Sequence, residues 1–84
     1  MNTLPRRLGQ RIKALRRERA LTQERLAERA DISVSFLSMI EGGRRVPHLS
    51  TVARLADGLE LPLVELFSFD AAVSRATPRK PKAA

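Results

Sequence analysis

The sequence predicts an all-α fold of five short helices around a single core. Apolar residues recur at helical spacing in successive segments, and glycines, prolines and helix-capping residues separate these segments. No segment alternates apolar and polar residues as a half-buried strand would. The chain has 84 residues, of which 43% are apolar, and this suffices for one small domain. We expect the domain to comprise residues 1–70.

The first predicted helix covers residues 5–20. Pro5 suits its first turn, where a missing backbone N–H costs little. Leu8, Ile12 and Leu15 follow one another at i, i+4 and i+7, so they form one apolar stripe. We expect this stripe to lie in the core.

The second predicted helix covers residues 23–30 and the third covers residues 34–41. Thr22 and Ser33 stand directly before them, where a side-chain hydroxyl can accept a hydrogen bond from the first turn. Asp31 lies between the two helices, at a position that requires a residue tolerant of left-handed backbone. The residues expected to face inward are Leu26, Ala27 and Ala30 in the second helix and Phe36, Leu37 and Ile40 in the third.

A fourth helix is expected over residues 48–58 and a fifth over residues 62–67. Gly42 and Gly43 end the third helix, and His48 stands in the N-cap place of the fourth, where it is a poor cap. The inward-facing residues of the fourth helix are expected to be Leu49, Val52, Leu55 and Ala56.

The composition argues against several classes of function. Cysteine is absent and His48 is the only histidine, so we expect no disulfide, no metal site and no nucleophilic relay. Trp and Tyr are absent, which argues against a single-strand binder built on stacking aromatic rings. No apolar run approaches the ~20 residues of a membrane span, and the N-terminal segment has no apolar signal region. We therefore expect a cytoplasmic protein that is not an enzyme and has no cofactor, membrane or small-molecule partner.

The net charge of +7 is concentrated at the two ends of the chain. Residues 1–20 contain seven Arg or Lys and one acid, residues 21–70 contain five and eight, and residues 71–84 contain four and none. A basic protein favours an anionic partner, nucleic acid before a membrane surface, although such charge also serves solubility alone. Residues 71–84 are expected to be a disordered basic tail, which either adds non-specific DNA affinity or has no function.

The second and third predicted helices are short and closely joined. Because only residues 31–33 connect them, they are expected to cross at a large angle rather than lie antiparallel. Ala27 and Ala30 supply the small residues that such a crossing needs. This is the helix-turn-helix arrangement, in which the second helix enters a DNA major groove ~12 Å wide.

Residues 8–67 resemble the phage-repressor family of helix-turn-helix domains, which includes lambda repressor, Cro and the XRE proteins. The similarity lies in the stretches LTQERLA, FLSMIEGGRRVP and LPLVELF, in this order and at the family's spacing. The resemblance implies a regulator of transcription that binds double-stranded DNA. We expect a sequence-specific repressor or autoregulator that acts as a homodimer at the nucleoid.

The resemblance also assigns roles to individual residues. Arg16 and Glu41 match an ion pair between the first and third helices, in which Arg16 is also oriented toward phosphate. The positions that face bases are matched by Ser33, Val34, Ser35, Ser38 and Met39. The positions that face phosphates are matched by Arg16, Thr22, Gln23, Arg44 and Arg45.

Three departures from the family pattern bear on function. Val34 and Met39 stand where relatives often carry Arg, Gln or Asn, which form bidentate hydrogen bonds with G or A. We therefore expect limited direct readout, with specificity drawn from thymine methyl groups and DNA shape. Asp31 replaces the usual turn glycine, and His48 replaces a serine N-cap.

The C-terminal end of the domain has apolar residues to spare. Val64, Phe67 and Phe69 are expected to form a symmetric dimer interface, unless Phe69 only covers its own core. A dimer would read two half-sites ~34 Å apart. The alternative function is an antitoxin or adaptor module that binds a protein partner through this apolar end. A restriction-modification controller is a further candidate within the DNA-binding class.

Overall fold

The computed structural model describes residues 2–70, and the expected tail at residues 71–84 lies outside them. The described part is all-helical, as predicted, with no strand. The elements are α1 (Leu4–Glu18), α2 (Gln23–Ala30), α3 (Val34–Glu41), α4 (Leu49–Leu59) and the 3-10 helix η1 (Leu63–Asp70).

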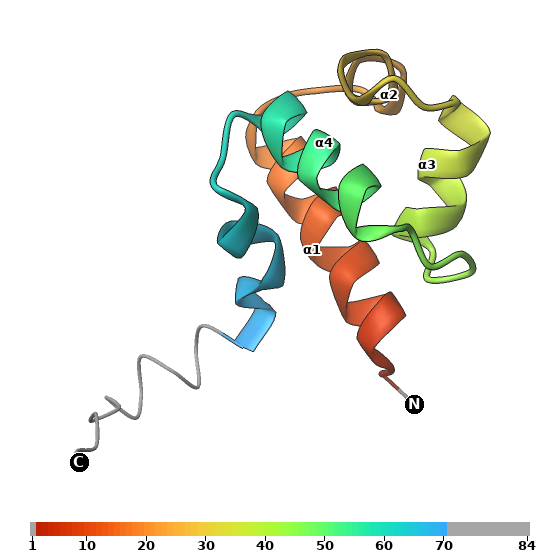
Figure 1. The fold of residues 1–84 in the computed structure, drawn as a ribbon, viewed down its shortest axis with the longest axis vertical. Helices are drawn as coiled ribbons and strands as arrows, with labels where there is room; N and C mark the ends of the chain where they lie inside the picture. The colour runs from red at the N-terminus through yellow and green to blue at the C-terminus, as the bar shows by residue number, and fades with distance from the viewer. Residues whose placement is uncertain (1, 71–84) are drawn as a thin grey trace.

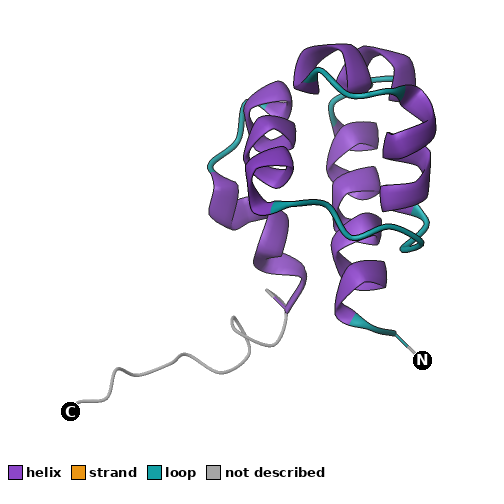
Figure 2. Cartoon of the chain, turned by 45° about the vertical axis from the view of Figure 1, so that its right-hand side comes forward, coloured by secondary structure: helices purple, strands orange, loops and turns teal. Residues whose placement is uncertain are grey.

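Helices α1 and α4 form the centre of the domain, with the other elements arranged around them (Figure 1). Helix α2 packs on α4, α3 packs on α1, and η1 lies against both central helices on the side away from α3. Turning the molecule brings the α2–α3 pair to one side and leaves α4 on the other (Figure 2). The α2–α3 pair therefore presents an outer surface that no other described element covers.

The core consists of aliphatic side chains contributed by all five elements. The predicted stripe of α1 is buried, with Ile12 fully enclosed between Leu8 and Leu15. The largest fully buried side chains are Ile12, Leu26, Leu37, Ile40, Val52, Leu55, Leu59 and Leu66. Burial of about eight such side chains is the main force that holds these short helices together, because helices of this length are unstable alone.

Two predicted helix caps are confirmed. The Thr22 hydroxyl oxygen accepts a hydrogen bond of 3.1 Å from the backbone N–H of Arg25, and the Ser33 hydroxyl oxygen accepts one of 3.0 Å from Phe36. Asp31 adopts the left-handed backbone expected of it, with φ 59° and ψ 47°. These three residues fix where α2 begins, where it ends and where α3 begins.

Several predicted boundaries and faces differ from the structure. Helix α1 ends at Glu18 rather than at residue 20, because Ala20 has left-handed backbone with φ 55°. Helix α4 starts at Leu49, after a His48 whose side chain makes no capping bond, as expected of histidine. The last element is a 3-10 helix, and Ser68 interrupts its helical dihedrals.

The prediction that Leu49 faces the core is wrong. Its side chain is 68% exposed, because it lies in the first turn of α4 at the outer edge of the stripe that Val52 and Leu55 define. Phe36 is only half-buried and packs at the margin of the core.

Three arginines join the ends of neighbouring helices. Arg54 of α4 donates to the carbonyl oxygen of Ala30 at the end of α2 over 3.0 Å, and Arg29 of α2 donates to that of Gly58 in the last turn of α4 over 2.9 Å. Arg19 donates to the carbonyl oxygen of Leu59. Cations at helix C-termini satisfy free carbonyl groups and oppose the negative end of the helix dipole. These arginines therefore have structural partners.

Candidate nucleic-acid interface

The site is built on the turn between α2 and α3. Asp31 turns the chain directly after α2, and the N–H of Ile32 bonds to the carbonyl oxygen of Ala27 over 3.0 Å. Ala27 and Ala30, the small residues expected here, are both buried. The result is a helix-turn-helix whose second helix has an outer surface left open.

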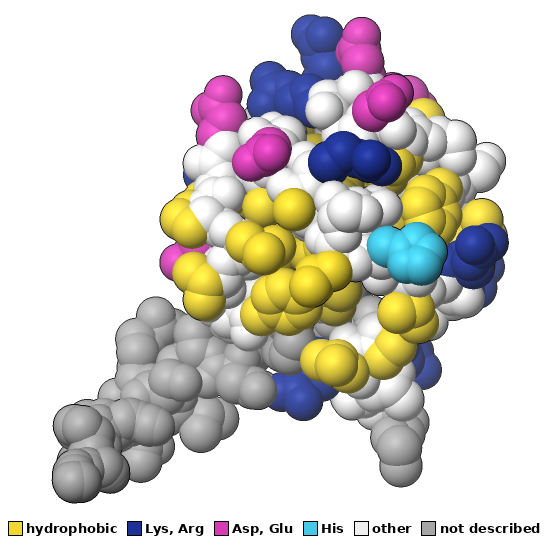
Figure 3. Space-filling model, viewed as in Figure 1, with side chains coloured by type: hydrophobic (Ala, Val, Ile, Leu, Met, Phe, Trp, Pro, Cys, Tyr) yellow, Lys and Arg dark blue, Asp and Glu magenta, His cyan; other side chains and the backbone are white. Residues whose placement is uncertain are grey.

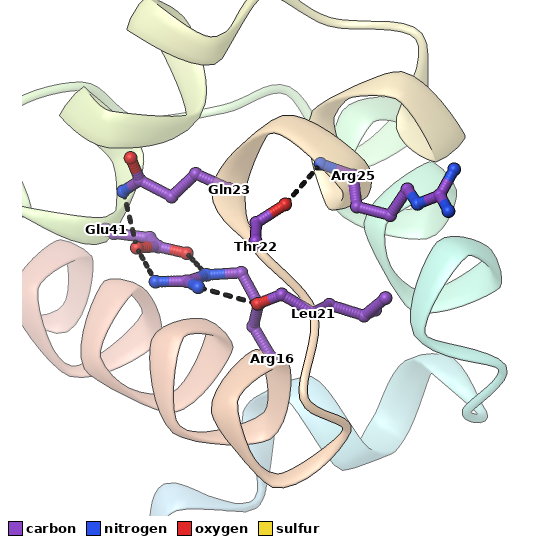
Figure 4. Close-up of polar contacts among 6 residues, drawn as sticks. All are labelled: Arg16, Leu21, Thr22, Gln23, Arg25 and Glu41. Carbon is purple, nitrogen blue, oxygen red and sulfur yellow. Dashed lines mark hydrogen bonds and ion pairs between the residues drawn. The ribbon is translucent and has the colours of Figure 1, made fainter.

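A buried ion pair connects the first helix with the end of α3, as the family resemblance implied (Figure 4). Arg16 Nε lies 2.7 Å from Glu41 Oε2, and Arg16 Nη2 donates to Glu41 Oε1 over 3.1 Å. The two side chains are 10% and 3% exposed. This bidentate geometry orients both groups and shields them from solvent.

The expected phosphate contact of Arg16 would use the N–H groups that its protein partners leave over. Its Nη1 donates to the carbonyl oxygen of Leu21 over 2.8 Å, so each of its three nitrogen atoms already has a protein partner. A guanidinium has five N–H groups, so these three bonds leave two, on a side chain that is 10% exposed. Arg16 is a structural residue that secures the α1–α2 connection to Glu41.

Gln23 binds the same carboxylate, Glu41, as Arg16 does, and this contact was not predicted from the sequence. Gln23 Nε2 donates to Glu41 Oε1 over 2.9 Å, which ties the first residue of α2 to the last residue of α3 (Figure 4). The Gln23 side chain is therefore oriented before any ligand arrives. An amide nitrogen carries two N–H groups, so one remains for an acceptor at the surface.

The outer surface of α3 brings together most of the residues expected to face DNA bases. Ser33 and Ser35 are exposed, and Val34, Ser38 and Met39 are half-buried. An open hollow lies over this surface, lined by Gln23, Val34, Ser35, Ser38, Met39 and Arg44. Ser33 is not among these lining residues, and its hydroxyl oxygen caps α3. The hollow thus joins candidate base-facing residues to candidate phosphate-facing residues.

A second hollow adjoins the first and contains a cation that the sequence analysis missed. Its lining residues are Lys13, Gln23, Ser38, Glu41, Gly42 and Arg44. Lys13 lies on α1 one turn before Arg16, and this spacing was the available signal for it. Lys13, Gln23 and Arg44 therefore come from three separate segments of the chain to one surface.

The remaining candidates occupy exposed positions around α3. Thr22 is exposed and its hydroxyl oxygen caps α2, which leaves its O–H available as a donor. Arg44 and Arg45 are exposed in the loop after α3. The Arg45 guanidinium carbon lies 5.4 Å from the centre of the Phe36 ring.

A separate surface carries exposed apolar side chains. Val64 is 65% exposed and Phe67 is 38% exposed, in agreement with their expected availability, while the side chain of Phe69 lies outside the described part of the structure. The other large apolar residues that are exposed are Leu63, also on η1, and Leu4, Val46 and Leu49. Hydrophobic side chains gather across the face of the molecule that has α4 in front (Figure 3). Within residues 2–70, no helix has the length and hydropathy that crossing a bilayer requires.

The fold and the surface of α3 together define a helix-turn-helix protein. The sequence model of the helix-turn-helix domain family matches residues 7–67, and the chain belongs to this family. The predicted likeness to phage repressors is confirmed: the chain is 54% identical over 52 residues to the immunity repressor protein of Bacillus phage phi105. That match covers 62% of this chain and 36% of the repressor, so the chain spans about a third of that relative.

Two further relatives are close to this chain in size. Control protein C.MunI of Mycoplasma sp is 38% identical over 69 residues, which are 81% of this chain and 93% of that protein. The solved structure of the restriction-modification controller protein C.AhdI from Aeromonas hydrophila superposes with a TM-score of 0.74 at 33% identity. The superposition covers 75% of this chain and 96% of the controller. The lambda-repressor-like, all-α fold expected from the sequence is thus confirmed.

Proposed function

We propose that this chain is a transcriptional regulator that binds double-stranded DNA sequence-specifically and acts as a repressor or autoregulator. The observation that carries the proposal is the hollow over α3, in which Gln23 and Arg44 flank Val34, Ser35, Ser38 and Met39. An α-helix fits the major groove of B-DNA, and groups beside it then meet the sugar-phosphate backbone. A protein acting on chromosomal DNA is expected at the nucleoid.

The phosphate contacts come from residues around the beginning of α2 and the end of α3. Gln23 is the first residue of α2, where free backbone N–H groups and the helix dipole favour an anion. Lys13 and Arg44 add two positive charges beside it. Thr22 precedes Gln23 in the chain, and Arg45 follows Arg44. Glu41 does not repel phosphate strongly, because Arg16 neutralises it and it is buried.

The base contacts are chemically modest. Ser35 and Ser38 can donate or accept, so a serine hydroxyl accepts more than one base. Val34 and Met39 can contact a thymine methyl group but form no hydrogen bond with a base edge. We therefore assign a large part of the specificity to thymine methyl contacts and to the shape of the DNA.

A homodimer would make this modest surface sufficient for specific DNA binding. A single domain contacts few phosphates, and a two-fold dimer doubles both the phosphate and the base contacts. Val64 and Phe67 on η1 lie on the apolar surface, together with Leu63, and we assign them to the interface with the expected Phe69. The relatives named as a phage repressor and as control proteins support a repressor or a restriction-modification controller as the biological role.

The same apolar surface supports the alternative, an antitoxin or adaptor that binds another protein. That function would use Val64 and Phe67 but would leave the hollow over α3 without a role. The two functions therefore differ in whether the hollow over α3 must remain intact.

Selection of bound fragments from random duplex DNA, followed by salt titration of the winning sequence, tests the proposal. We expect a two-fold symmetric site and an affinity that falls steeply with salt. Arg25→Ala is a matched control, because the exposed Arg25 side chain points away from Gln23 and Glu41 (Figure 4). Recovery of no enriched sequence, with a folded protein, would contradict the proposal and favour the protein-binding alternative.

A further inference from the structure

Phe36 lies on the side of α3 away from Gln23. Successive residues of a helix are rotated by about 100° around its axis. Val34 and Ser38 therefore share one flank of α3, and Phe36 lies about 160° around the axis from each of them. Val34 and Ser38 line the hollow together with Gln23, and Phe36 does not. The two flanks of α3 therefore carry different groups: Gln23 on one and the Phe36 ring on the other.

A cation, the Arg45 guanidinium, lies over the ring of Phe36. The Arg45 guanidinium carbon lies 5.4 Å from the ring centre, within the range of a cation–π contact. Phe36 is itself held by packing against the margin of the core, so it is a fixed platform rather than a second mobile side chain. Among the described residues no carboxylate pairs with Arg45. Stacking engages the face of a guanidinium and leaves its N–H edges available to an acceptor.

A helix in the major groove has one DNA strand along each of its flanks. Gln23, Lys13 and Arg44 would meet the strand on one side, as proposed above. On the other side the structure offers the Phe36–Arg45 pair, in which an exposed arginine lies in the loop that follows the helix.

We propose that Phe36 is a positioning residue that holds Arg45 against the backbone of the second DNA strand, opposite the strand that Gln23 contacts. This inference rests on the proposed DNA-binding function and goes beyond it, because it gives α3 a clamp on each flank. Without the ring, the arginine side chain has many rotamers, and ordering it on binding costs conformational entropy. With the ring, part of this ordering is already present in the free protein.

The test is a double-mutant cycle of Phe36→Leu and Arg45→Ala, measured as affinity for the selected duplex. We expect Phe36→Leu to weaken binding by about two- to fivefold in the wild-type background, the size of an exposed cation–π contact. In the Arg45→Ala background the same substitution should have no further effect. Phe36→Tyr keeps an aromatic ring and should retain wild-type affinity. Equal losses from Phe36→Leu in both backgrounds would assign the residue a merely structural role and overturn the inference.

Duplexes carrying single neutral methylphosphonates provide the strand-specific readout. One methylphosphonate should abolish the contribution of Arg45 to the duplex affinity, and another should abolish that of Gln23. We expect these two methylphosphonates to lie on opposite strands. If both methylphosphonates lie on the same strand, the clamp is overturned and the proposed function is left intact. If Gln23→Ala and Arg45→Ala both bind the selected duplex as tightly as the wild type, the clamp is overturned while DNA binding stands. If the wild-type protein binds no duplex, the proposed function itself fails, and the inference fails with it.

Discussion

Gly9 faces the carbonyl oxygen of Ile40 so closely that no side chain fits between them. A β carbon on Gly9 would overlap that oxygen and would lie 2.7 Å from the carbonyl oxygen of Glu41. This close approach brings α1 against the end of α3, and it is there that Arg16 reaches Glu41. The candidate interface therefore depends on a glycine outside it.

Gly9→Ala is expected to destabilise the fold by about 1–3 kcal/mol, because the obstructing atoms belong to the backbone and the helices must separate. Denaturant unfolding measures this. Gly42→Ala is the matched control, since a β carbon there would have its nearest neighbour at 3.5 Å. Equal stability of the two variants would show that the α1–α3 contact is looser than described.

Replacement of Glu41 by alanine is expected to reduce the stability of the fold more than its replacement by glutamine. Glu41→Ala leaves the buried Arg16 guanidinium unpaired, and loss of one partner of a buried ion pair costs about 3–5 kcal/mol. Glu41→Gln keeps one acceptor for Arg16 and should cost less. Thermal unfolding of both variants checks the order, and a reversed order would argue against the pair as a structural element.

The reciprocal arginine contacts between α2 and α4 predict a loss of stability without a loss of DNA contacts. Arg54→Ala removes the donor to the carbonyl oxygen of Ala30 and is expected to cost about 1 kcal/mol. Affinity for the selected duplex, measured well below the unfolding temperature, should be unchanged. A large drop in affinity in a folded Arg54→Ala protein would mean that this arginine contacts DNA.

Replacement of thymine by uracil in the selected duplex tests the readout assigned to Val34 and Met39. Removal of a contacted methyl group should weaken binding by about 1 kcal/mol, the scale of burial of one methyl or methylene group. Titration of duplexes with single substitutions measures it. The prediction of limited hydrogen-bond readout would be wrong if several single G·C changes each cost more than ~3 kcal/mol.

Sedimentation equilibrium of Val64→Glu tests the dimer. A carboxylate at this exposed apolar residue should shift the protein to monomer and weaken binding to the two-fold site. Ala14→Glu places the same charge at an exposed position on α1 and should leave assembly unchanged. A wild-type protein that stays monomeric at high micromolar concentration, with and without DNA, would contradict the dimer.

The sequence predicted much of this architecture because local signals agreed with one another. Thr22, Ser33 and Asp31 are residue types with strong positional preferences, and each has the predicted backbone or cap. Leu49 was misplaced because periodicity alone does not reveal where neighbouring elements stop covering a helix.

The parts of the site that the sequence did not reveal depend on distant contacts. Gln23 meets Glu41 only because α2 and α3 fold together, and Lys13 joins the interface only because Gly9 lets α1 lie close to α3. The burial of Arg16 beside Glu41 likewise follows from tertiary packing and from no local pattern.

The most direct test of the central claim is the duplex affinity of a triple variant, Gln23→Ala, Ser35→Ala and Arg44→Ala. These residues line one hollow, and their removal should cost about 3 kcal/mol or more in binding, because hydrogen bonds to charged phosphate are lost. Fluorescence anisotropy with the selected duplex measures this, and circular dichroism verifies the fold. A still-folded variant that binds the duplex as tightly as the wild type would contradict the assignment of α3 to the major groove.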